Sequence, residues 1–118
     1  MHYTITAEEG LIRARVSGRT ADEPPSHICK AVLAEANRLG IKRILVELTQ
    51  KVALSGSSQF HLVVNLNALG MTPQHRIALV HHTPGLYEAN DMVDLAASNR
   101  GLNVRSFPSV DAALAWLA

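Results

Sequence analysis

Residues 40–69 read GIKRILVELTQKVALSGSSQFHLVVNLNAL, and this stretch decides the fold. It predicts a turn at Gly40, a strand over Lys42–Leu48, a polar loop, and a helix that begins near Ser57. The strand is an apolar run broken only at Glu47, which is typical of a strand inside a mostly parallel sheet. The loop brings hydroxyls and a glycine to a helix N-terminus, a place that suits a capping hydroxyl, an anion or a phosphoserine.

The rest of the chain continues this alternation of strands and helices. Two alternating segments at the N-terminus, separated by a short turn, predict an antiparallel hairpin. Ser109 is a predicted N-cap for the last helix. The inward stripe of that helix is expected to be Val110, Ala113, Leu114 and Leu117, helped by Trp116. The predicted strands are His2–Ala7, Leu11–Ser17, Lys42–Leu48, His75–His82 and Leu102–Phe107, and the predicted helices begin near Ser26, Ser57, Pro84 and Val110.

Three glycines stop the predicted helices at a nearly constant interval. Gly40, Gly70 and Gly101 are 30 and 31 residues apart, and each is followed by a predicted strand and then a predicted helix. A βα unit repeated in this way predicts parallel strands with right-handed crossovers. Strand alternation makes one face of the sheet apolar and the other mixed. We therefore predict an α/β superhelix of order ββαβαβαβα, with five strands, an antiparallel N-terminal edge strand, and helices mainly on one face.

The composition sets the class of protein. A chain of 118 residues predicts a single domain over 1–118, and the formal net charge of +1 gives no reason to expect a nucleic-acid partner. The single cysteine, Cys29, is expected to pack as a small apolar side chain, and a lone thiol favours the cytoplasm. The polar start is unlike a signal peptide, and no apolar run approaches the roughly 20 residues that span a bilayer.

The ending VRSFPSVDAALAWL, residues 104–117, carries a family resemblance. With the order ββαβαβαβα and the glycine-stopped helices, it resembles the STAS-like domains, whose prototype is the bacterial anti-sigma factor antagonist of the SpoIIAA type. The ending looks especially like the uncharacterised SpoIIAA-like branch. The resemblance implies a cytoplasmic, non-enzymatic binding or regulatory module without a cofactor. Its expected partner is an unknown protein or a small apolar, lipid-like ligand, and a homodimer is an open alternative.

In the antagonist family, a serine in the loop after the second parallel strand is phosphorylated. The matching position here is Ser57, but Gly56 replaces the family's Asp and Gln59 replaces its Gly. Because a kinase must recognise the surroundings of its serine, we predict that Ser57 is a structural cap and is not phosphorylated.

Polar residues gather where the parallel strands are expected to end. Ligands favour the crevice outside the carboxyl ends of such strands. These residues therefore predict either a ligand pocket at two helix N-termini, or helix caps beside a solvated loop. The candidate pocket edge is Glu47, Thr49, His81, His82 and Thr83, and the candidate ligand or phosphate loop is Ser55, Gly56, Ser57 and Ser58.

The mixed face of the sheet carries a second candidate site. Its arginines could bind an anion or a lipid headgroup, or form a solvated face partly paired with Glu47. The arginines are Arg13, Arg15, Arg76 and Arg105.

Metal and catalytic alternatives are less favoured by the spacing. His81 and His82 are adjacent on a strand and point to opposite faces, so no metal site is expected. A hydrolase would need His81 beside Ser57, with Glu47 orienting the histidine. We therefore predict that the protein is not an enzyme.

Overall fold

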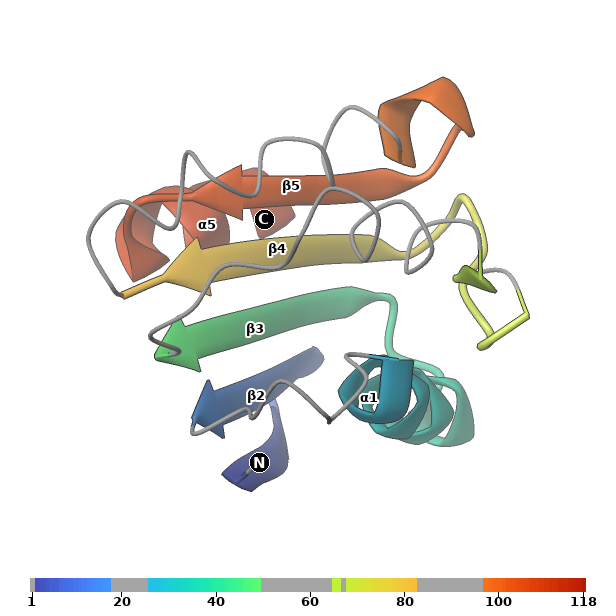
Figure 1. Ribbon diagram of the computed structural model, residues 1–118, viewed down its shortest axis with the longest axis horizontal. Helices are drawn as coiled ribbons and strands as arrows, with labels where there is room; N and C mark the ends of the chain where they lie inside the picture. Colours follow the sequence, from blue (N-terminus) through green and yellow to red (C-terminus); the bar gives the residue numbers. More distant parts are fainter. Residues whose placement is uncertain (1, 18–25, 50–64, 67, 83–96) are drawn as a thin grey trace.

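The computed structural model describes residues 2–17, 26–49, 65–66, 68–82 and 97–118 (Figure 1). Within these ranges the chain has an α/β fold, with five strands in one sheet of order β1-β2-β3-β4-β5. In chain order the elements are β1 (His2–Glu8), β2 (Leu11–Ser17), α1 (Ser26–Leu39), β3 (Arg43–Thr49), β4 (Arg76–His81), β5 (Asn103–Phe107) and α5 (Val110–Leu117). All five predicted strands are present, and each strand end lies within one residue of its predicted position.

The predicted hairpin is confirmed. Strands β1 and β2 are antiparallel, and Glu8 pairs with Leu11. This pairing leaves Glu9 and Gly10 as a two-residue turn, with φ angles of 51° and 76°. Positive φ at both central residues is the requirement of the type I′ turn, whose twist matches that of the flanking strands.

The remaining strand pairs are parallel, as the sequence predicts. Strand β2 pairs with β3, β3 with β4, and β4 with β5, all in parallel. The register aligns one row of residues across four strands, with Arg13 opposite Leu45, Leu45 opposite Ala78, and Ala78 opposite Arg105. The sheet is therefore mostly parallel, with β1 as its antiparallel edge among the described strands.

The three helix-stop glycines share one geometry. Gly40, Gly70 and Gly101 have φ angles of 70°, 113° and 72°, a left-handed region that favours glycine. After each glycine, the next residue donates its N–H to the carbonyl four residues before that glycine, as in the Schellman motif. The three bonds are Ile41 to Ala36 at 2.9 Å, Met71 to Leu66 at 3.0 Å, and Leu102 to Ala97 at 2.9 Å. The same backbone hydrogen bond is therefore found at each of the three glycines that define the predicted repeat.

The two long described helices cover opposite faces of the sheet, and Figure 1 shows α5 behind the strands. Helix α1 packs through Val32, Leu33 and Ala36 on the face that carries the apolar residues of β2. On the other face, α5 buries Leu45, Ala78 and Val80. Leu66 and Ala97, from the second and third predicted helices, pack in the α1 cluster, so α5 is the exception among the described residues to the prediction that helices lie mainly on one face. The mixed face has an apolar half over β3 and β4 that also requires cover.

Helix α5 begins as predicted. The Ser109 hydroxyl accepts a hydrogen bond from the Ala112 N–H at 3.2 Å, so Ser109 is the N-cap. The Trp116 ring lies 5.6 Å from the Phe107 ring, between centroids, as part of the packing on the sheet. Ala113 and Leu117 are buried, as predicted, whereas Leu114 is 37% exposed. The expectation that Leu114 faces the sheet is wrong, because the inward stripe centres on Ala113 and Leu117.

Candidate functional site

The polar half of the α5 face lies at the carboxyl ends of β2, β3 and β4. Strand alternation places Arg13, Arg15 and Glu47 on this face, and the first residue after β4, His82, joins them. The His82 N–H donates to the Leu48 carbonyl at 2.9 Å, so the ladder between β3 and β4 holds the backbone of His82. Three side chains, two from β2 and one from the residue after β4, therefore meet around the carboxylate of Glu47 on β3.

Glu47 is the centre of this cluster. Its Oε2 accepts hydrogen bonds from Arg13 Nε at 2.8 Å and Arg15 Nε at 3.1 Å. Its Oε1 lies 3.1 Å from His82 Nε2. The Glu47 side chain is only 9% exposed, whereas that of Arg15 is 67% exposed. A buried carboxylate is thus held in place by three donor side chains, and one of them, Arg15, is largely exposed to solvent.

These donors determine the charge of Glu47. Burial by itself would raise the pKa of Glu47, but the hydrogen bonds from Arg13, His82 and Arg15 outweigh it and lower the pKa to about 2. Near neutral pH, Glu47 is therefore an ionised, acceptor-only group. It follows that His82 Nε2 carries a proton and donates it to Oε1. The same contact with Glu47 raises the pKa of Arg13.

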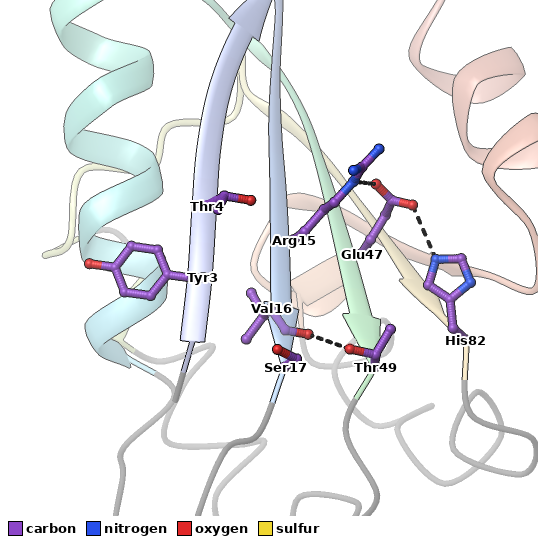
Figure 2. A pocket seen from close by; sticks show the side chains of 8 residues that line it. All are labelled: Tyr3, Thr4, Arg15, Val16, Ser17, Glu47, Thr49 and His82. Atoms are coloured by element: carbon purple, nitrogen blue, oxygen red, sulfur yellow. Dashed lines mark hydrogen bonds and ion pairs between the residues drawn. The ribbon is translucent and has the colours of Figure 1, made fainter.

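An open pocket of about 430 Å³ lies beside this cluster (Figure 2). Two rows of side chains on the α5 face line it, one containing Thr4, Arg15 and Glu47, and the next containing Ser17, Thr49 and His82. The Thr49 hydroxyl donates to the Val16 carbonyl at 3.1 Å, which ties β3 to β2 at the pocket floor. In Figure 2, Arg15 and Glu47 point to one side of the sheet, and Tyr3 points to the other.

The structure brings together three of the five residues predicted for the pocket edge. Glu47, Thr49 and His82 line the pocket. His81 is buried and, by strand alternation, lies on the α1 face, so the predicted divergence of the two histidines is confirmed. A hydrolytic pair of His81 and Glu47 is therefore not formed. Thr83 and the loop Ser55, Gly56, Ser57 and Ser58 lie outside the described residues.

The four predicted arginines do not form one surface. Arg13 and Arg15 bind Glu47, as the paired alternative predicts. Arg76 instead donates from Nη1 to the Trp116 carbonyl at 3.1 Å, and its guanidinium lies 5.9 Å from the centre of the Trp116 ring. Arg105 is exposed on β5, and the buried pair Leu45 and Ala78 separates it from Arg13 in the register.

Two further groups belong to the packing of the chain. Cys29 contacts the core as predicted, and burial raises the pKa of its thiol to about 12, so it is no reactive thiolate near neutral pH. Within the described ranges, no group of three or more His, Cys, Asp or Glu side chains could hold a metal ion.

One buried polar network was missed by the sequence analysis. His75 is fully buried; its Nδ1 accepts from the Thr72 N–H at 3.0 Å, so its Nε2 donates to Asn37 Oδ1 at 3.0 Å. Asn37 in turn donates to the Gly70 carbonyl at 3.1 Å. Burial, together with the charge of Lys42, lowers the pKa of His75. This network connects the end of α1 to the segment before β4, and it is structural. No local pattern links Asn37 to a histidine so distant in sequence.

No family model, curated protein or solved structure matches the chain. Among the described residues, no helix is long and apolar enough to cross a membrane.

Proposed function

We propose that this chain is a non-enzymatic binding or regulatory module of STAS-like type, and that its ligand or partner binds at the strand-end pocket beside Glu47. The sheet order β1-β2-β3-β4-β5, with an antiparallel first pair and parallel pairs after it, agrees with the expected arrangement of strands. The glycine-stopped repeat supports the same assignment. The pocket lies at the carboxyl ends of the parallel strands, where α/β sheets hold their ligands.

The observation that carries this proposal is the state of Glu47. Both of its oxygens accept hydrogen bonds, and its pKa is lowered to about 2. A general base needs a pKa near the working pH and a free lone pair directed at the substrate. The pKa of Glu47 is far from neutral pH and both of its oxygens are already hydrogen-bonded, so it serves as the fixed centre of a preorganised surface. Such a surface favours binding over proton transfer.

The lining of the pocket also indicates the kind of ligand. Six of the residues around it, Thr4, Arg15, Ser17, Glu47, Thr49 and His82, carry hydroxyl, imidazole or charged groups. Pockets for apolar molecules are lined mainly by apolar and aromatic side chains. The described pocket therefore offers hydrogen-bonding groups to a polar ligand, beside apolar surface from Tyr3 and Val16.

Native mass spectrometry of the protein from its own host tests the proposal, followed by mapping of the retained molecule with ¹H–¹⁵N spectra. The expected result is a non-covalent ligand or protein partner whose removal shifts the signals of Ser17, Thr49 and His82. Replacing Glu47 with Gln should weaken its binding. The matched control is Glu35→Gln, which removes the carboxylate of an ion pair on α1 and should leave binding unchanged. A retained molecule that maps elsewhere, or that the protein converts chemically, would contradict the proposal.

A further inference from the structure

The charges around Glu47 do not balance. Two guanidinium groups, from Arg13 and Arg15, face one carboxylate. Arg13 makes the shorter bond, its side chain is 25% exposed, and Glu8 also attracts it. Arg13 is therefore the closer counter-ion of Glu47, and Arg15 is the more exposed of the two guanidinium groups.

Arg15 also offers hydrogen-bond donors to a ligand. It uses Nε for Glu47, and no acceptor from the described residues is within hydrogen-bonding distance of its two Nη groups. Its side chain is 67% exposed and lines the pocket, with Thr4 beside it in the same row and Ser17 in the next row of the same face (Figure 2). An arginine whose Nε is fixed by a carboxylate has less conformational freedom to lose when its Nη groups bind an anion.

From this geometry we infer that the pocket binds the phosphate group of a small molecule, with Arg15 as the main ligand-contacting residue. The Thr4 hydroxyl, which lies in the same row on β1, supplies a further donor, and Glu47 is a positioning residue that fixes the guanidinium. This inference rests on the proposed function, because it names the ligand class of the same pocket.

Phosphate fits this set of donors better than other ligand chemistries. The Glu47 oxygens already accept three hydrogen bonds, so the pocket offers little to a cation. A carboxylate has two oxygens and would be satisfied by the Arg15 fork alone, whereas a phosphate group has three or more and can also accept from hydroxyls. The pocket volume of about 430 Å³ leaves room for the rest of a small molecule.

Titration with inorganic phosphate, followed by ¹H–¹⁵N spectra near neutral pH and at constant ionic strength, tests the inference. Saturable shifts are expected at Arg15, Ser17 and Thr49. Arg15→Gln should weaken phosphate binding roughly tenfold or more, because charged hydrogen bonds are lost. Arg15→Lys, which keeps the charge without the fork, should weaken binding less than Arg15→Gln. The control Arg105→Gln changes another exposed arginine of the same sheet face and should bind like the wild type.

Equal phosphate affinity in the wild type and Arg15→Gln would overturn the inference, as would shifts spread over the whole surface. Since Arg15 is largely exposed, both of its variants are expected to fold, and their spectra provide the check.

A second arm separates a free phosphate from a lipid headgroup. Phosphatidylcholine vesicles that contain phosphatidic acid should not sediment the protein if the ligand is a small soluble molecule. Sedimentation that Arg15→Gln abolishes would overturn the small-molecule assignment in favour of a membrane surface. A failure of this inference can be told from a failure of the proposed function. If phosphate does not bind while a retained uncharged molecule maps to the pocket, only the ligand class is wrong.

Discussion

The α5 face of the sheet has two halves of opposite character that meet within strand β3. Leu45 lies in the dry half, fully buried with Ala78 and Val80 beneath α5. Two residues further along the same strand, Glu47 is the centre of an ionic cluster whose arginine partner Arg15 is largely exposed. The comparison shows that alternation assigns a residue to a face, but the helix above determines whether that position is apolar packing or a site. Stability comes from the first half, and binding is proposed for the second.

The largest expected effect is in the dry half. Leu45→Ala should lower the free energy of unfolding by about 3 kcal/mol, because a fully buried leucine leaves a cavity under α5. Chemical denaturation at neutral pH measures this change. A loss below about 1 kcal/mol would show that α5 does not cover Leu45 as described.

The contribution of the ionic half to stability should depend on pH. The pKa of Glu47 is about 2 in the folded protein, against an ordinary value of 4.5. A carboxylate with a lowered pKa stabilises the fold above its unfolded pKa, and this contribution is lost as the pH falls from about 4.5 towards 2. We expect a loss of about 2 kcal/mol, less than the full shift implies, because Arg15 is screened by solvent.

Denaturation curves of the wild type and Glu47→Gln across this pH range isolate the effect from the other carboxyl groups. The variant should be less stable at neutral pH, and its deficit should shrink as the pH falls. Parallel curves at all pH values would contradict the assignment of the low pKa to Glu47.

A smaller effect is expected at the start of α5. Ser109→Ala removes the hydroxyl that accepts from the Ala112 N–H and should cost about 1 kcal/mol. Thermal unfolding measures the change, and Ser109→Asp, which keeps a capping acceptor, should restore most of the lost stability. Equal unfolding temperatures for Ser109→Ala and the wild type would show that the Ser109 cap does not stabilise the fold.

The smallest effect is expected on the outer side of α5. Leu114→Gln should change the free energy of unfolding by less than about 0.5 kcal/mol, because Leu114 is partly exposed and contributes little to the buried stripe. Leu117→Ala on the same helix should cost about 2 kcal/mol or more. Similar losses in both variants would mean that both sides of α5 are packed.

Much of the fold is visible in the sequence because its signals are local. Gly40, Gly70 and Gly101 are readable as stops, since a left-handed helix end favours glycine wherever it occurs. The convergence of Glu47, Thr49 and His82 also follows from the sequence, since the carboxyl ends of parallel strands meet at one edge of the sheet.

The features that the sequence did not predict depend on long-range packing. Which face α5 covers is set by the direction in which the chain turns after β5, and no residue of 110–117 encodes this alone. For the same reason, the four arginines looked equivalent in sequence, although α5 holds Arg76 while Glu47 holds Arg13 and Arg15. The buried pairing of His75 with Asn37 joins residues 38 positions apart and has no local signature.

The central claim is that Glu47 is an ionised, fully engaged carboxylate that positions Arg15. The most direct test is a pH titration of the Glu47 side-chain carboxyl carbon by ¹³C NMR, in the wild type and in Arg13→Gln. The account predicts a pKa of about 2 for Glu47 in the wild type. It predicts a higher pKa in Arg13→Gln, which lacks the hydrogen bond that lowers the pKa of Glu47 most. A wild-type pKa at the ordinary value of 4.5, unchanged in Arg13→Gln, would contradict it.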